Sequence, residues 1–194
     1  MRKSLIIPIG IVLVLMGAVA YRMVAGPSTS DAGGLAPFLR GEMTPVSVVT
    51  PPEALPQTLI HLPDGEKAPL ASLEGKALLI NLWAPWCAPC KAEMKELAAL
   101  QKELGDADFE VVAINVDRGG VGQARDILKE WGAPNLAPYA DPTMALAMDL
   151  AKGSLPTSLI VDRKGRIRGK YLGPLKWDEP EAIKLFTALK KGRI

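Results

Sequence analysis

Two cysteines separated by two residues offer the clearest chemistry in this sequence. They are Cys87 and Cys90, in the motif Trp-Cys-Ala-Pro-Cys, and the 194-residue chain has no others. The motif follows an apolar run, residues 77–84, and precedes a helix-forming segment, residues 91–104. A strand that leads into a helix through Cys-x-x-Cys is typical of a thiol redox site. The upstream sulfur then lies at the positive end of the helix, which favours a thiolate.

Other uses of the two cysteines are less well supported. A structural disulfide usually ties distant segments, and closing a two-residue gap stabilises little because the loop is short. Covalent haem attachment is not indicated, since Lys91 rather than a histidine follows Cys90. A zinc or copper site needs more ligands, and the only histidine, His61, lies outside the motif. We therefore predict redox activity with no metal and no cofactor.

Glu93 is the residue best placed to assist these thiols. It lies three residues after Cys90, on the same side of the predicted helix. It continues into a core-facing stripe of leucines, Leu97, Leu100 and Leu104. A carboxyl group there is at least partly desolvated, so its pKa is raised and it can exchange a proton with Cys90. The helical spacing alone leaves open a rim glutamate paired with Lys91 or Lys95.

The rest of the chain alternates between strand and helix patterns. The predicted strands are residues 59–62, 77–84, 109–116, 158–161 and 166–171, and the predicted helices are 91–104, 121–131, 144–151 and 179–190. This order predicts an α/β fold with a central sheet of mixed strand direction, flanked by helices. Arg166, Arg168 and Lys170 alternate with other residues along the last strand, which predicts one solvated face.

The N-terminal part predicts a membrane anchor followed by a linker. Residues 5–21 carry no charge, close to the roughly 17–20 apolar residues that a spanning helix needs. Arg2 and Lys3 precede them, which predicts a cytoplasmic tail and an outward-facing domain. We predict an N-terminal transmembrane helix within residues 1–25, although Ala18-Val19-Ala20 also resembles a signal-peptide cleavage site.

Two further segments complete the predicted organisation. Residues 26–58, rich in proline, glycine and serine, read as a linker that is partly docked on the domain, and residues 59–194 as the folded domain. The net charge of +2 includes no basic block of the kind that tracks a phosphate backbone. We therefore expect no nucleic-acid partner.

The sequence resembles the thioredoxin fold, and more narrowly the TlpA/ResA/CcmG group of membrane-anchored thiol-disulfide oxidoreductases, most of all its TlpA branch. The segments that carry the resemblance are residues 81–93 (NLWAPWCAPCKAE), residues 153–157 (GSLPT), Asp162 with Gly165, residues 41–43 (GEM) and residues 173–177 (GPLKW). The resemblance covers residues 59–189 and implies a thioredoxin-like fold.

The resemblance also implies a role for each matching residue. Cys87 is then the exposed nucleophile and Cys90 the resolving thiol, while Trp86 flanks the site and limits access. Pro156 is then a cis-proline that faces the cysteines, and the backbone of Leu155 pairs with the substrate chain. Glu93 is then the functional glutamate that this group has at this position. Asn81 stands where thioredoxin itself has a buried aspartate, which fits the group and assigns the proton work to Glu93.

For partners, the resemblance implies a periplasmic domain on the inner (cytoplasmic) membrane. A transmembrane thiol transporter of the CcdA/DsbD type supplies electrons, and the clients are disulfide-containing proteins, either apocytochrome c or the copper-site proteins of cytochrome oxidase. The TlpA resemblance favours the oxidase clients. Two alternatives stay open: a disulfide oxidant or isomerase, and a non-enzymatic tethered client-binding module with a structural disulfide.

Overall fold

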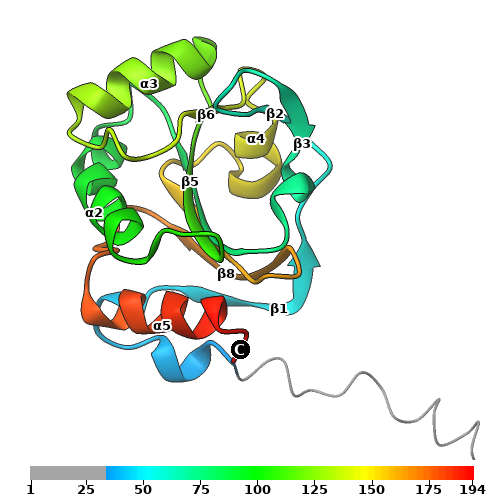
Figure 1. The fold of residues 1–194 in the computed structure, drawn as a ribbon, viewed down its shortest axis with the longest axis vertical. Helices are drawn as coiled ribbons and strands as arrows, with labels where there is room; N and C mark the ends of the chain where they lie inside the picture. Colours follow the sequence, from blue (N-terminus) through cyan, green and yellow to red (C-terminus); the bar gives the residue numbers. More distant parts are fainter. Residues whose placement is uncertain (1–33) are drawn as a thin grey trace, which may run out of the picture. The chain divides into compact units, whose positions relative to one another are not determined.

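The computed structural model describes residues 34–194, in which a mixed β-sheet is flanked by helices on both faces (Figure 1). The strands of this part are β1 (Ser47–Ala54), β2 (Leu59–His61), β3 (Lys67–Pro69), β4 (Ala77–Trp83), β5 (Phe109–Asn115), β6 (Tyr139–Ala140), β7 (Thr157–Val161) and β8 (Arg166–Leu172). Its helices are α2 (Ala88–Leu104), α3 (Gly120–Glu130), α4 (Ala145–Ala151) and α5 (Pro180–Lys190), with short 3-10 helices η2 (Ala36–Phe38), η3 (Gly41–Met43) and η4 (Leu70–Leu73). Every predicted strand and helix is present, with ends that differ by at most three residues.

The strand order explains how the cysteine motif is positioned. The order across the sheet is β1-β8-β7-β4-β5-β6-β2-β3. β4 and β5 run parallel, as do β5 and β6, while β7 and β8 pair antiparallel beside β4. The sheet is therefore mixed, as predicted. Parallel neighbours need a crossover connection, and α2 supplies it between β4 and β5. The motif occupies the point where central strand β4 passes into α2.

Two apolar layers lie on opposite faces of this sheet. α2, α3 and α5 cover one face, and α4 with η4 covers the other. Because side chains alternate along a strand, Leu79 and Trp83 of β4 point toward α2, whereas Leu78, Ile80 and Leu82 point toward α4. The same alternation turns Asn81 toward α2, where the site lies.

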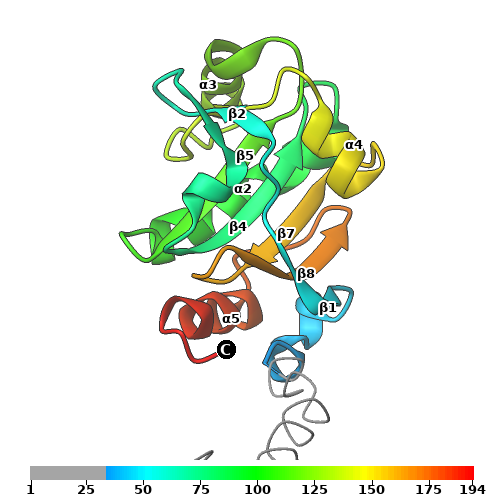
Figure 2. The ribbon, with the colours of Figure 1, turned by 90° about the vertical axis from the view of Figure 1, so that its right-hand side faces the viewer.

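The segment before β2 is part of the fold. It lies within the residues predicted as a partly docked linker, yet β1 forms an edge strand that pairs antiparallel with β8 (Figure 2). Leu35, Met43 and Val46 are buried in the same layer as α2 and α5. The prolines of β1, Pro51 and Pro52, suit an edge, where a missing N–H leaves no ladder bond unmade.

The predicted solvated face of β8 is wrong at Arg168, whose side chain is only 3% exposed. The N-terminal segment and the C-terminus cover it, since a Cβ at Gly34 would lie 3.3 Å from Arg168 Nη2 and 3.1 Å from Ile194 Cβ. Arg168 Nη1 lies 3.2 Å from Asp162 Oδ2, and Arg166 Nη2 lies 2.8 Å from the same oxygen. Burial alone would raise the pKa of Asp162, but hydrogen bonds from both arginines outweigh it and lower that pKa.

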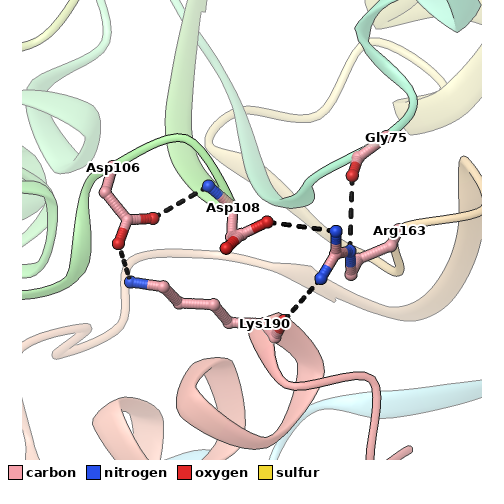
Figure 3. A network of polar contacts seen from close by, with 5 residues as sticks. All are labelled: Gly75, Asp106, Asp108, Arg163 and Lys190. Atoms are coloured by element: carbon pink, nitrogen blue, oxygen red, sulfur yellow. Dashed lines mark hydrogen bonds and ion pairs between the residues drawn. The ribbon is translucent and has the colours of Figure 1, made fainter.

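A polar network ties the far end of α5 to the sheet (Figure 3). Arg163 bonds Asp108 at 3.0 Å, the Gly75 carbonyl at 3.3 Å and the Lys190 carbonyl at 3.2 Å. The Lys190 ammonium in turn pairs with Asp106, just after the C-terminal end of α2. These contacts fix α5 beside α2 at the end opposite the cysteines.

The predicted anchor, residues 1–25, lies outside the described residues. Among residues 34–194, no helix is both long enough and apolar enough to cross a membrane.

Candidate active site

The cysteine motif forms the first turn of α2. Cys87 is the N-cap residue, and its Sγ accepts a hydrogen bond from the Cys90 amide at 3.2 Å. Pro89 lies in the first turn, where an amide hydrogen is not needed. The helix therefore starts at Ala88, three residues before the predicted start. A disulfide joins the two cysteines, with their Cα atoms 5.3 Å apart.

The two sulfur-bearing residues differ in their access to solvent. Cys87 is 5% exposed and Cys90 is fully buried. Cys87 is thus less exposed than predicted, because the chain turns back there and its amide bonds the Ala84 carbonyl at 3.0 Å. It still presents the only surface of the pair, so an external disulfide can approach Cys87 and not Cys90. Trp86 stands beside it with 63% of its surface exposed.

Two of the predicted substrate-binding residues, Leu155 and Pro156, immediately precede β7 at the same end of the sheet. The Leu155–Pro156 peptide bond is cis, as the resemblance implies. Thr157, the first residue of β7, pairs with Leu82 near the end of β4. This register places Leu155 and Pro156 beside the strand end that leads into the cysteine motif. The Pro156 carbonyl accepts from the Gly173 amide at 2.9 Å, which ties this turn to the end of β8.

Glu93 is buried at the centre of a polar network. It is 2% exposed, so the alternative of a rim glutamate paired with lysine is wrong. Its Oε1 accepts from Asn81 Nδ2 at 2.8 Å. Its Oε2 accepts from the Leu175 amide at 3.0 Å and from Trp177 Nε1 at 3.1 Å. Lys91 instead lies near Glu130, at 3.8 Å.

Burial raises the pKa of Glu93 from 4.5 to about 7. The hydrogen bonds from Asn81, Leu175 and Trp177 act in the opposite direction, because they stabilise the charged carboxylate. The negative charge of Glu96, one turn further along α2, adds to the rise. Desolvation is the largest of these effects, so the carboxyl changes its protonation near neutral pH.

Sequence reasoning missed the two hydrogen-bond donors to Glu93 Oε2. Leu175 and Trp177 belong to the loop after β8, where no periodic pattern marks a buried position. Residues 173–177 stood out only through the family resemblance. Ser158 was also missed, although it pairs directly with Asn81 and accepts from Asn81 Nδ2 at 2.9 Å. The strand register of β4 and β7 creates this contact, and a single sequence does not reveal register.

This arrangement suits reversible disulfide chemistry. A disulfide at a helix N-terminus opens to a favoured thiolate, and a carboxyl with a pKa of about 7 lies one turn beyond the inner sulfur. Among residues 34–194, no three histidine, cysteine, aspartate or glutamate side chains come together as metal ligands.

Comparisons with known proteins agree with this chemistry. The Redoxin family profile matches residues 50–185. Thiol:disulfide interchange protein HelX of Rhodobacter capsulatus is 34% identical over 119 residues, which are 60% of this chain and 65% of HelX, slightly less than two thirds. Thiol-disulfide oxidoreductase ResA of Bacillus cereus is 27% identical over 173 residues, 89% of this chain and 90% of ResA.

Among solved structures, a DsbE thiol:disulfide interchange protein from Chlorobium tepidum superposes with a TM-score of 0.60. It is 23% identical and covers 74% of this chain and 99% of its own. At this identity the likeness shows the fold alone, which is thioredoxin-like.

Proposed function

This chain belongs to the Redoxin family and is a thiol-disulfide oxidoreductase, and we propose that it works as a reductase of disulfides in client proteins. One observation carries the proposal: the inner cysteine of a helix-capping pair lies one turn from a buried carboxyl that titrates near pH 7. Such a group can take the proton that the inner thiol must lose before it can attack. A purely structural bridge has no use for it.

The proposed cycle starts from the dithiol form. The Cys87 thiolate attacks one sulfur of a client disulfide, and the other client sulfur leaves as a thiolate that takes a proton from water. Cys90 then gives its proton to Glu93 and attacks the Cys87 sulfur of the mixed disulfide. The second client sulfur leaves as a thiolate and also takes a proton from water. Two electrons thus pass to the client, the Cys90 proton stays on Glu93, and the Cys87–Cys90 disulfide closes.

Trp86, Leu155 and Pro156 form the client-facing rim in this proposal. Their support is placement, since Trp86 is exposed beside Cys87 and the other two lie at the same strand end. An extended client segment would pair with the backbone at Leu155. Trp86 would then restrict which side chains come near the sulfur.

The resemblance to the TlpA/ResA/CcmG group extends the proposal to the cell. Residues 1–25 anchor the chain in the inner membrane, and the catalytic domain faces the periplasm. A transmembrane thiol transporter of the CcdA/DsbD type returns electrons to the disulfide. The clients are apocytochrome c or, as we favour, copper-site proteins of cytochrome oxidase.

Trapping the mixed disulfide tests this assignment. Cys90→Ser keeps the attacking thiol and removes the resolving one, so client adducts should accumulate in cells and be released by reductant. Cys87→Ser is the matched control and should trap nothing. Trapping by Cys87→Ser alone would reverse the two roles.

The redox state in growing cells separates the alternatives. Alkylation of the wild-type protein should find it mainly reduced. A mainly oxidised protein with adducts in Cys90→Ser would indicate an oxidant or isomerase. An oxidised protein without adducts would indicate a client-binding module.

A further inference from the structure

A pocket of about 290 Å³ opens beside Glu93, on the face of the sheet that α2 and α5 cover. We call it the Glu93 pocket. Ala92, Glu93 and Glu96 of α2 line one side, and Lys176 of the loop after β8 lines another. Glu42 of η3 also lines the pocket. The buried carboxyl that serves the inner thiol therefore borders a cavity with its own charged rim.

Glu96 stands out among the residues of this pocket. It lies three residues after Glu93, so the two side chains are neighbours on one side of α2. Its Oε2 is buried and has no hydrogen-bond partner within residues 34–194. A buried acceptor without a partner costs free energy, and a hydrogen bond from a water molecule or from a protonated Glu93 would relieve that cost. The neighbouring Glu93 carries the proton that such an acceptor would receive.

We propose that Glu96 relays the proton between Glu93 and solvent through the Glu93 pocket. The proposal rests on the function proposed above and deepens it. In the reducing direction, Cys90 gives its proton to the Glu93 carboxylate as its sulfur attacks the mixed disulfide. Glu93 then passes that proton to Glu96, and Glu96 releases it to water in the pocket. The proton that leaves Cys90 thus reaches bulk solvent without crossing the client-covered surface at Cys87.

Other charged groups near Glu93 set the conditions for this relay. Cys90 and Glu96 share its helix, Lys176 faces the pocket from the loop after β8, and Glu42 faces it from η3. Glu181 of α5 lies behind η3, where a Cβ at Gly41 would come within 3.6 Å of its Oε2. The hydrogen-bonding partners from β4 and the loop are an asparagine amide, a backbone amide and an indole, which do not titrate in this range.

The test follows the two sulfur steps separately in the purified, reduced full chain. Rapid mixing with an equal amount of dithiobis-nitrobenzoate releases one coloured thiolate when Cys87 attacks and a second when Cys90 resolves. Glu96→Ala should slow the second release roughly tenfold and leave the first unchanged, since proton transfer by a positioned group contributes at least that much. Added acetate, which is small compared with the pocket volume of about 290 Å³, should restore the second release. Glu103→Ala, an exposed glutamate on the same helix, is the control and should behave as wild type.

A second variant separates the relay from a simple effect of charge. Ala92→Leu adds bulk to an exposed position on the pocket wall and changes no charge. Ala92→Leu should slow the second release, and added acetate should not restore its rate. The pH midpoint of the second release, at which its rate is half-maximal, should stay as in wild type. Glu96→Gln should lower that midpoint, because it removes a charge that raises the pKa of Glu93.

The outcomes distinguish this proposal from the function on which it rests. Wild-type second release in both Glu96→Ala and Ala92→Leu, with a slow second release in Glu93→Gln, would overturn the relay and keep the role of Glu93. Wild-type behaviour of Glu93→Gln itself would overturn the proposed proton chemistry. A slow Glu96→Ala that acetate does not restore would leave only a charge effect and would also overturn the relay.

Discussion

Replacing Glu93 by glutamine should change the pH dependence of stability. The unfolding free energy of Glu93→Gln, measured relative to wild type, should rise as the pH rises. The folded-state pKa of Glu93 is about 7, against 4.5 for a solvated glutamate. Between these values the folded state binds a proton that the unfolded state has lost, so wild-type stability falls as pH rises through this window. At about 1.4 kcal/mol per pKa unit, the difference amounts to about 3 kcal/mol.

Glutamine removes this dependence because it carries no charge at either pH. Its carbonyl can accept from Leu175 and Trp177 in place of Oε2. Its amide can donate to Asn81 Oδ1, a buried oxygen without a partner among the described residues, once the Asn81 amide turns over. Any constant gain or loss from these bonds cancels when two pH values are compared. The pH-dependent part of the difference therefore reports the Glu93 charge alone.

The assay is denaturant unfolding of the oxidised domain, residues 34–194, because the closed disulfide removes the thiols from the titration. The unfolding free energy of Glu93→Gln minus that of wild type should rise by about 3 kcal/mol between roughly pH 4 and pH 8. Glu103→Gln should show no such rise, since its side chain is exposed on the same helix. An equal difference at both pH values would refute the reasoning that burial governs this carboxyl.

Two further predictions concern parts of the fold that support the site. Met43→Ala should lower the unfolding free energy by about 2–5 kcal/mol, as for other large buried side chains, because Met43 is fully buried. Met148→Ala, at a residue that is 61% exposed, should change it little. Equal effects of the two substitutions in a thermal or denaturant melt would mean that η3 is not part of the core. Asp162→Asn should lower the unfolding free energy by about 2 kcal/mol near neutral pH, as expected for lost hydrogen bonds to a charged group. Because the fold lowers the pKa of Asp162 from 3.8, this loss should shrink as the pH falls below 3.8 and wild-type Asp162 becomes protonated. A loss that persists in acid would show that the charge of Asp162 is not its source.

The elements that position the site were predictable because each has a local signal. The run 77–84 is apolar on both faces, which marks a covered strand, and α2 shows the leucine stripe of a core-facing helix. The burial of Glu93 follows from that stripe, because helical spacing puts this residue in line with the leucines. How deeply Glu93 is buried, and which groups bond its carboxyl, depend on the tertiary fold.

What the sequence did not reveal depends on contacts between distant segments. β1 has two prolines and no fully buried side chain, so its composition resembles a linker, and only pairing with β8 makes it a strand. Arg168 alternates like a surface residue, but the segment around Gly34 covers it. Trp177 and Asn81 meet Glu93 from 84 and 12 residues away, and no local periodicity encodes such a meeting.

The cost of Glu93 to the fold is itself an argument for its role. Three donors from β4 and from the loop after β8 hold the carboxyl, yet desolvation still outweighs them and keeps its pKa near 7. An apolar side chain in the leucine stripe would avoid this cost, since the position is buried and faces the core. The fold therefore carries a destabilising group at the one position where the proposed mechanism needs a proton exchanged with the buried Cys90 thiol. Groups with strongly perturbed protonation gather at functional sites for this reason, and here the perturbed group and the inner cysteine share one turn of one helix.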